Sequence, residues 1–167
     1  IVLNSLLKPL IEPHLPDWAE VRWYAGKEEA FALAPAAEIG WFDMHSKADM
    51  AHVFTLATKL KWLNSVYAGV EAFPLEVLAQ RGVVLTNGAG INAVPIAEYV
   101  VMLMLAHSKN YREVVRAQDR REWLKDSPGK RELFGSKALI LGYGAIGQEV
   151  EKRLAGFGMT VSKVRRS

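Results

Sequence analysis

The most constraining feature of this sequence is an apolar run that ends in three closely spaced glycines. In residues 138–147 (ALILGYGAIG), Gly142, Gly144 and Gly147 follow the spacing G-x-G-x-x-G. The four residues before the first glycine read as a strand, and residues 148–157 read as an amphipathic helix. The bare spacing alone would favour a glycine-rich turn without a ligand, but a strand that turns sharply into a helix at such a motif is typical of dinucleotide sites. The flanking residues therefore favour a dinucleotide site.

Each glycine has a separate expected role. We expect Gly142 to make the tight turn out of the strand, Gly144 to let the backbone approach a pyrophosphate, and Gly147 to allow close helix-to-strand packing. The first N–H groups of the helix and the positive end of its dipole would face the anion. The other residues of the predicted cofactor-binding segment are Tyr143, Ala145 and Ile146. These three would offer backbone N–H groups to the pyrophosphate or cover it, and Ile146 is expected to pack under the helix.

The residues after the next expected strand, 159–164, bear on which dinucleotide is bound. NAD-binding domains usually place an acidic residue there, which accepts a hydrogen bond from the ribose 2′-hydroxyl. This chain instead has Arg165, Arg166 and Ser167. Guanidinium groups suit the 2′-phosphate of NADP by charge and by bidentate geometry, so we predict NADP in preference to NAD. The alternative is a solvated basic segment without a ligand.

Composition excludes several classes of function. The chain has 167 residues, half of them apolar, and no cysteine. It therefore has no disulfide, thiolate metal site or cysteine nucleophile, which fits a reducing compartment such as the cytoplasm. Residues 1–7 are apolar but lack a charged leader, so we read them as a first strand and not as a signal peptide.

Charge and hydrophobicity argue against nucleic acid and membrane partners. Residues 1–106 hold 7 Lys/Arg and 11 Asp/Glu, whereas residues 107–167 hold 14 and 7. In the basic part the charges alternate in sign without an aromatic stacking pattern, which favours a solvated helical face. The longest apolar stretch, 93–106, contains Glu98 and is shorter than the about 20 residues that span a bilayer. We predict a buried helix there, capped by Asn92 and with Pro95 in its first turn.

The first part of the chain alternates short apolar runs with helical patterns, which predicts an α/β fold with a parallel sheet covered on both faces. Strands are expected at 2–3, 21–24, 38–42, 60–66 and 83–86, and helices at 9–15, 27–34, 48–58 and 74–80. The turn-rich connector 87–92 marks a boundary between domains 1–91 and 92–167. Within 107–136 we expect a helix up to Trp123 and then a loop. The second domain supplies two of about six strands, so we expect it to be incomplete and unstable by itself.

Several segments together resemble the D-isomer-specific 2-hydroxyacid dehydrogenases, and their order and spacing cover residues 60–167. They are residues 67–71, 81–87, 90–99, 118–123 and 141–147. The resemblance implies a flavodoxin-like substrate domain, a hinge, a Rossmann NAD(P) domain and an active site between the two domains. It also implies a homodimer, with 107–136 as the dimerisation arm, and small 2-keto acids such as glyoxylate or hydroxypyruvate as substrates.

The resemblance also assigns a substrate-binding loop. Ala68, Gly69 and Val70 are similar to the family segment whose backbone N–H groups hold the substrate carboxylate. A loop at the carboxyl end of a parallel strand can form such an anion nest, although a plain strand-to-helix turn is the alternative. Glu71 stands where the family usually has Asp, and we expect a similar structural role for it. Glu98 could be taken for a catalytic carboxylate, but we interpret it as a paired helix or hinge residue.

No catalytic residue is assigned within the chain. The resemblance implies a catalytic Arg and a His–Glu pair that lie after residue 167. The four histidines show neither metal-pair nor triad spacing; they are His14, His45, His52 and His107. We therefore expect NAD(P)H-dependent reduction of a 2-keto acid to a D-2-hydroxy acid, or the reverse, in a longer protein, with the 167 residues alone inactive. The alternatives are a non-enzymatic dinucleotide-binding scaffold or corepressor of the same fold, or a truncated product that only dimerises or does nothing.

Overall fold

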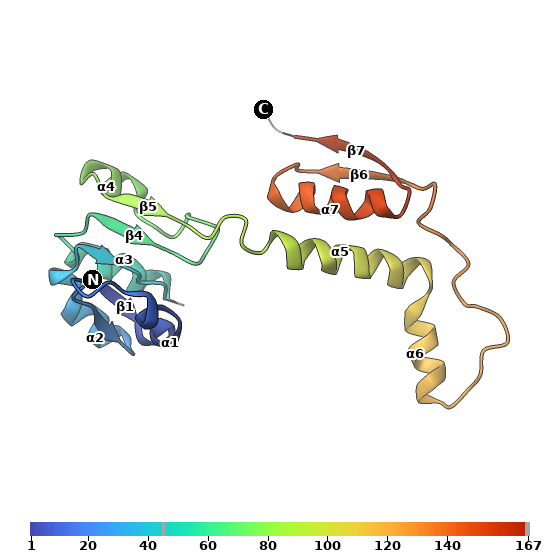
Figure 1. The fold of residues 1–167 in the computed structure, drawn as a ribbon, viewed down its shortest axis with the longest axis horizontal. Coiled ribbons are helices and arrows are strands. Elements are labelled where there is room, and N and C mark those ends of the chain that lie inside the picture. The colour runs from blue at the N-terminus through green and yellow to red at the C-terminus, as the bar shows by residue number, and fades with distance from the viewer. Residues whose placement is uncertain (45, 166–167) are drawn as a thin grey trace. The chain divides into compact units, whose positions relative to one another are not determined.

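The computed structural model describes residues 1–44 and 46–165 and divides the chain into two compact units, Ile1–Ala89 and Gly90–Ser167 (Figure 1). The expected boundary, after residue 91, falls two residues later. His45, Arg166 and Ser167 lie outside the described residues.

The first unit is built on five parallel strands in the order β2-β1-β3-β4-β5. In chain order they are β1 (Val2–Asn4), β2 (Arg22–Tyr24), β3 (Ile39–Gly40), β4 (Trp62–Asn64) and β5 (Val84–Thr86). Val2 pairs with Arg22 on one side and with Gly40 on the other, and Trp62 lies between Ile39 and Val84. This is the flavodoxin-like order, so the predicted fold class is confirmed. Four of the five strands are shorter than expected and lie within their predicted runs, whereas β1 extends one residue beyond its predicted run.

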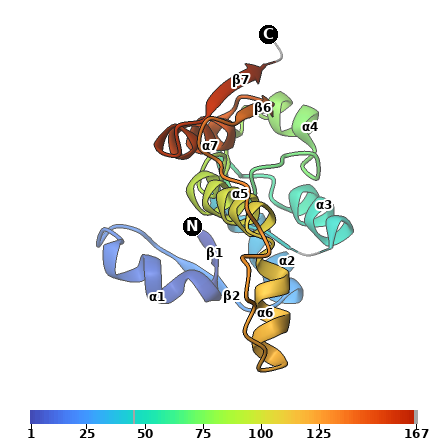
Figure 2. The ribbon, with the colours of Figure 1, turned by 90° about the vertical axis from the view of Figure 1, so that its right-hand side faces the viewer.

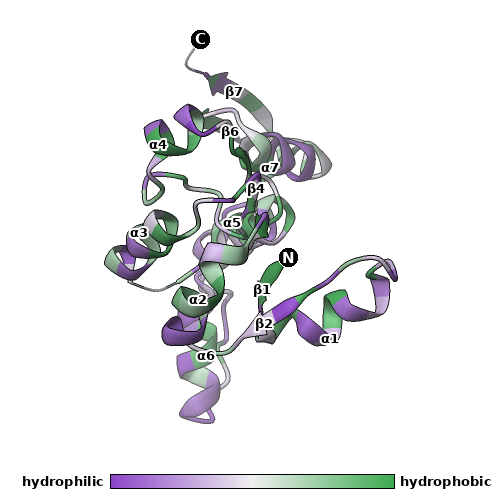
Figure 3. Cartoon of the chain, turned by 90° about the vertical axis from the view of Figure 1, so that its left-hand side faces the viewer, coloured by the Kyte–Doolittle hydropathy of each residue, from purple (hydrophilic) through white to green (hydrophobic). Residues whose placement is uncertain are grey.

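Helices and a compact aromatic core complete the first unit. The helices are α1 (Lys8–Ile11), α2 (Lys27–Leu33), α3 (Lys47–Leu56) and α4 (Leu75–Gln80), with short 3-10 turns at Ser5–Leu7, Glu12–His14 and Ala34–Ala36. Hydrophilic and hydrophobic residues are mixed along α2 and α3, as expected of helices with one buried side (Figure 3). In the core, the centroid of the Phe42 ring lies 5.9 Å from that of Tyr24 and 6.5 Å from that of Phe54.

The elements of the second unit are α5 (Ala93–Ser108), α6 (Tyr111–Asp119), β6 (Lys137–Leu141), α7 (Ala145–Gly156) and β7 (Thr160–Val164). In this unit, α7 packs against a two-stranded parallel sheet, and α5 packs against α7. β6 and β7 run side by side from Lys137 opposite Thr160 to Leu141 opposite Val164, with α7 beside them (Figures 1 and 2). Ala97, Val101, Val150 and Leu154 form the centre of the small core.

Two helix predictions for this unit are corrected. The helix expected to reach Trp123 is interrupted at Asn110, whose φ of 47° is left-handed, and α6 ends at Asp119. α5 was expected to be a buried helix, but Tyr99, Met102 and Leu103 are exposed on it. The reason is that α7 covers only one face of α5 within this unit. Across residues 1–44 and 46–165, no helix has the length and hydrophobicity to cross a membrane.

Candidate functional site

The glycine-rich turn between β6 and α7 has a geometry that depends on glycine at two positions. Gly142 has a φ of 94°, a left-handed conformation that glycine adopts without a steric penalty. Its N–H donates to the carbonyl of Val164 at 2.9 Å, which ties the turn to β7. A Cβ on Gly147 would lie 2.6 Å from the carbonyl oxygen of Gly142 and 3.2 Å from Cγ2 of Ile140. Only glycine at position 147 therefore allows α7 to lie this close to β6.

Gly144 is the N-cap residue of α7, and the space around its Cα is unoccupied by other protein atoms. A Cβ built on Gly144 would meet no other atom within 4 Å, and no side chain caps the helix here. The first turn of α7 contains no acidic residue. A helix N-terminus with uncapped N–H groups and no adjacent negative charge suits an anion. The turn thus fits the pyrophosphate of a dinucleotide.

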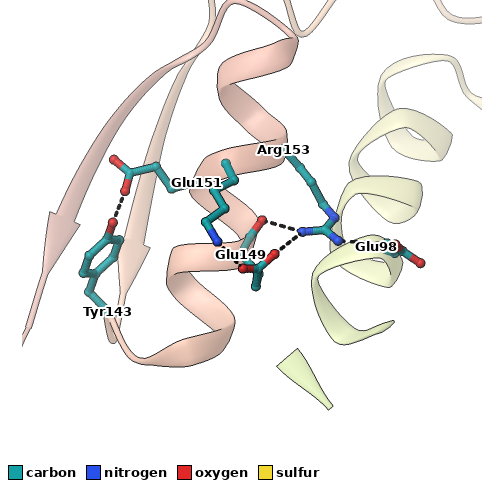
Figure 4. Close-up of polar contacts among 6 residues, drawn as sticks. Glu98, Tyr143, Glu149, Glu151 and Arg153 are labelled. Carbon is teal, nitrogen blue, oxygen red and sulfur yellow. Dashed lines mark hydrogen bonds and ion pairs between the residues drawn. The ribbon is translucent and has the colours of Figure 1, made fainter. Parts of the chain in front are cut away.

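The side chain of Tyr143 is held between α7 and β7. Its hydroxyl donates to the carboxylate of Glu151, as Figure 4 shows. The Nζ of Lys163 lies 2.8 Å from Oε1 of Glu151 and 4.4 Å from the centroid of the Tyr143 ring. The hydrogen bond from Lys163 lowers the pKa of Glu151, and the bond to Glu151 raises the pKa of Lys163. Tyr143 can therefore serve a ligand only through its backbone unless this cluster opens.

Other predicted cofactor residues are placed differently. Ile146 was expected to pack under the helix, but its side chain is 41% exposed. The prediction was wrong because Gly147, Val150 and Leu154, at helical spacing, are the buried residues of α7. Ala145 is exposed, and so is Arg165, just after β7. Arg166 and Ser167 lie outside the described residues, so the structure says nothing of them.

Glu98 pairs with Arg153 of α7, as Figure 4 shows. Oε1 of Glu98 lies 3.3 Å from Nη2 of Arg153, whose Nη1 lies 2.7 Å from Oε2 of Glu149. The hydrogen bond to Glu149 raises the pKa of Arg153. Glu98 is therefore a paired residue between α5 and α7, but its side chain is 64% exposed and not buried as expected.

In the first unit, the loop after β4 contains three consecutive backbone N–H groups that donate to no described residue. The carbonyl oxygens of Tyr67 and Ala68 accept hydrogen bonds from the N–H of Gly88 at 3.0 Å and from Nδ2 of Asn87 at 2.7 Å. Among the described residues, none accepts a hydrogen bond from the N–H of Ala68, Gly69 or Val70. Ala68 and Gly69 are exposed, whereas the side chain of Val70 packs against the core. The carboxylate of Glu71 borders the loop, since a Cβ on Gly69 would lie 2.5 Å from its Oε2.

Asp43 fixes this loop, a role that the sequence reasoning missed. Oδ2 of Asp43 accepts hydrogen bonds from Nε1 of Trp41 and from the N–H of Val66, both at 2.7 Å. Oδ1 accepts from Oγ of Ser65 at 2.7 Å, and that oxygen in turn accepts from the N–H of Tyr67 at 3.0 Å. The signal in the sequence was an aspartate directly after the third expected strand. Asp43 thus joins the end of β3 to the loop after β4.

A pocket of about 570 Å³ lies at the carboxyl ends of β1 to β4. In flavodoxin-like sheets ligands bind at this edge, where the strand order reverses between β1 and β3. Aromatic and apolar side chains form much of its wall: Leu6, Leu7, Tyr24, Trp41, Met44 and Tyr67. The hydroxyl of Tyr24 donates to the carbonyl of Trp41 at 2.9 Å, and burial raises the pKa of Tyr24 to about 12. Tyr67 links this pocket to the loop that begins at Ala68.

Comparisons with known proteins agree with this geometry. Residues 101–167 match the NAD-binding domain of the D-isomer-specific 2-hydroxyacid dehydrogenases. The chain is 29% identical over 162 residues to the D-3-phosphoglycerate dehydrogenase of Mycobacterium bovis, covering 96% of the chain and 31% of that protein. It is 26% identical over 135 residues to the hydroxypyruvate reductase of Thermotoga maritima, covering 81% of the chain and 44% of that protein.

A solved structure supports the same assignment. The crystal structure of a D-isomer-specific 2-hydroxyacid dehydrogenase family protein from Aeromonas salmonicida superposes with a TM-score of 0.79 at 28% identity. The match covers 99% of the chain and 53% of that structure. The chain is therefore similar to the D-isomer-specific 2-hydroxyacid dehydrogenases along nearly all of its length, and residues 101–167 match their NAD-binding domain. It spans about a third of the Mycobacterium relative and about half of the solved one.

Proposed function

We propose that this chain carries the substrate-binding unit and the coenzyme turn of a nicotinamide-dependent oxidoreductase that interconverts a small 2-keto acid and a D-2-hydroxy acid. The observation that carries the proposal is the turn between β6 and α7. There Gly142 and Gly147 are required by conformation and packing, and Gly144 leaves open space at an uncapped helix N-terminus. The relatives named D-3-phosphoglycerate dehydrogenase and hydroxypyruvate reductase support this assignment.

The residues of the chain bind and orient the reactants. The first N–H groups of α7, at Ala145 and Ile146, would hold the pyrophosphate next to Gly144. When bound, the nicotinamide supplies or accepts a hydride. The N–H groups of Ala68, Gly69 and Val70 would hold the substrate carboxylate, because Asn87 and Gly88 secure the carbonyl side of this loop.

We further propose NADP as the preferred coenzyme over NAD, with Arg165, Arg166 and Ser167 at the 2′-phosphate. Arg165 is exposed directly after β7, where the ribose of a bound dinucleotide would lie. Lys163 contributes little to this preference because Glu151 neutralises it.

We also propose a homodimer, formed through the segment 107–136. Trp123 is 93% exposed and Val114 of α6 is 37% exposed, so this segment offers apolar surface to a second copy. Sedimentation of the natural protein at increasing concentration tests the proposal. A monomer at all concentrations would contradict it.

Gly144→Ala in the natural protein tests coenzyme binding. The new methyl group meets no protein atom. We therefore expect the Tm to stay nearly unchanged while the Kd for NADPH and NADH rises about tenfold, since the backbone can no longer approach the pyrophosphate. Gly156→Ala, at the other end of the same helix, is the matched control and should leave both Kd values unchanged. Equal affinities of the Gly144→Ala variant and the unsubstituted protein would contradict the assignment.

A further inference from the structure

The pocket at the carboxyl ends of β1 to β4 continues directly into the loop that is proposed to hold the substrate carboxylate. Val66 and Tyr67 line the pocket, and the backbone N–H groups that lack a described acceptor begin at the next residue, Ala68. A 2-keto acid held by its carboxylate at this loop would therefore place its remaining substituent beside the pocket. The inference below rests on the proposed function, because it concerns the same site.

The formal charge of the residues that line the described part of the pocket is negative. Asp43 acts only as a hydrogen-bond acceptor, towards three donors, as an ionised carboxylate does. Asp49 lies with its Oδ2 3.5 Å from the Nζ of Lys27, so these two charges cancel. The charged residues among the described lining residues are Asp43, Asp49 and Lys27. Their formal charges sum to −1.

We infer that this pocket accepts an uncharged substituent and disfavours a phosphorylated one. A phosphate group would bring negative charge next to Asp43, and the cation that lines the described part of the pocket, Lys27, is already paired with Asp49. The aromatic and aliphatic side chains of Tyr24, Trp41 and Met44 instead offer apolar contacts. The chain therefore differs in substrate class from relatives that are named for a phosphorylated substrate.

A matched pair of substrates tests the inference in the natural protein. Hydroxypyruvate and 3-phosphohydroxypyruvate differ only by the phosphate. We expect kcat/KM to be at least about tenfold higher for hydroxypyruvate, because like charges that are brought together in a partly buried site repel strongly. A higher kcat/KM for the phosphorylated compound would overturn the inference.

Two substitutions of opposite sign test the electrostatic cause. Asp49→Asn releases Lys27 and should raise the ratio of phosphorylated to unphosphorylated kcat/KM about threefold or more, whereas Lys27→Gln should lower that ratio. Asp17→Asn makes the same chemical change as Asp49→Asn, at an exposed position outside the pocket, and should leave the ratio unchanged. Because the readout is a ratio within one variant, partial loss of folded protein does not change it. Equal ratios in all three variants would overturn the inference.

The outcomes also separate this inference from the proposed function. If neither keto acid is reduced or bound, the proposed function fails and the inference fails with it. If both are reduced and the phosphorylated compound is preferred, only the inference fails.

Discussion

Asp43 connects two loops that are far apart in sequence. Its three donors come from Trp41 next to it and from Ser65 and Val66, more than twenty residues away. Without this carboxylate the N–H of Val66 and the hydroxyl of the buried Ser65 would lose their acceptor. Because an unpaired polar group in a partly buried site costs free energy, Asp43 stabilises the loop as well as shaping the pocket.

We predict that Asp43→Ala lowers the free energy of unfolding by roughly 2–4 kcal/mol, since it leaves more than one donor unpaired. Asp43→Asn should cost less, because its one carbonyl oxygen can still accept. Urea denaturation followed by circular dichroism measures both. Asp17→Ala, at an exposed site, is the control and should change stability by less than about 0.5 kcal/mol. A similarly small change for Asp43→Ala would show that the carboxylate is not needed for the fold.

Gly147 and Gly156 both lie in α7, so the same Gly→Ala substitution can be compared at a packed and at an open position. Gly147→Ala forces a methyl group to within 2.6 Å of the carbonyl oxygen of Gly142 and should destabilise the chain by about 1–3 kcal/mol. Gly156→Ala meets no atom within 4 Å and should be neutral or stabilising by roughly 0.5–1 kcal/mol. Thermal unfolding of the two variants tests this contrast. Equal Tm values would mean that α7 does not depend on close packing at Gly147.

At the scale of elements, a polar cluster attaches β7 to α7. Lys163 of β7 bonds to Glu151 of α7, and Tyr143 of the turn between β6 and α7 bonds to the same carboxylate. The strand pair β6 and β7 exposes Leu139 and Leu141 on its other face in the described part of the chain. The cluster therefore adds polar contacts between β7 and α7, where the sheet has hydrophobic packing on only one of its faces.

The acid stability of the second unit should depend on this cluster. The hydrogen bond from Lys163, and then that from Tyr143, lowers the folded pKa of Glu151 below its ordinary 4.5. Its stabilising contribution is therefore present above pH 4.5 and is lost as the pH falls through the lower, folded value. Glu151→Gln should lower the Tm at pH 7 and weaken the fall of Tm below pH 4.5. Glu132→Gln, at an exposed site, should leave the pH profile unchanged, and identical profiles for both variants would contradict the prediction.

The elements could be predicted because their signals are local. Apolar runs such as those that became β4 and β5 were recognised from a few neighbouring residues, and the turn at Gly142 from the glycine spacing. Burial was harder to predict because it depends on what packs against an element. Ile146 and Glu98 are exposed for this reason, and the break at Asn110 comes from a left-handed residue inside a helix-favouring sequence. The Asp43 network joins distant segments, so no local pattern could reveal its partners.

At the scale of the whole molecule, both units place their candidate sites at the same kind of position. In each, backbone N–H groups become available where a parallel strand ends and the chain turns: after β4 at Ala68 and after β6 at Gly144. Parallel α/β sheets bind ligands outside the carboxyl ends of their strands, where the chain turns into the following helix and the N–H groups of that turn face the ligand. One unit is thereby suited to a small carboxylate and the other to a dinucleotide pyrophosphate.

The most direct test of this account is a fluorescence titration of the natural protein with NADPH and with NADH. The account predicts saturable binding of both, tighter for NADPH, and weaker binding of both after Gly144→Ala. An absence of saturable binding by either reduced coenzyme would contradict the central claim.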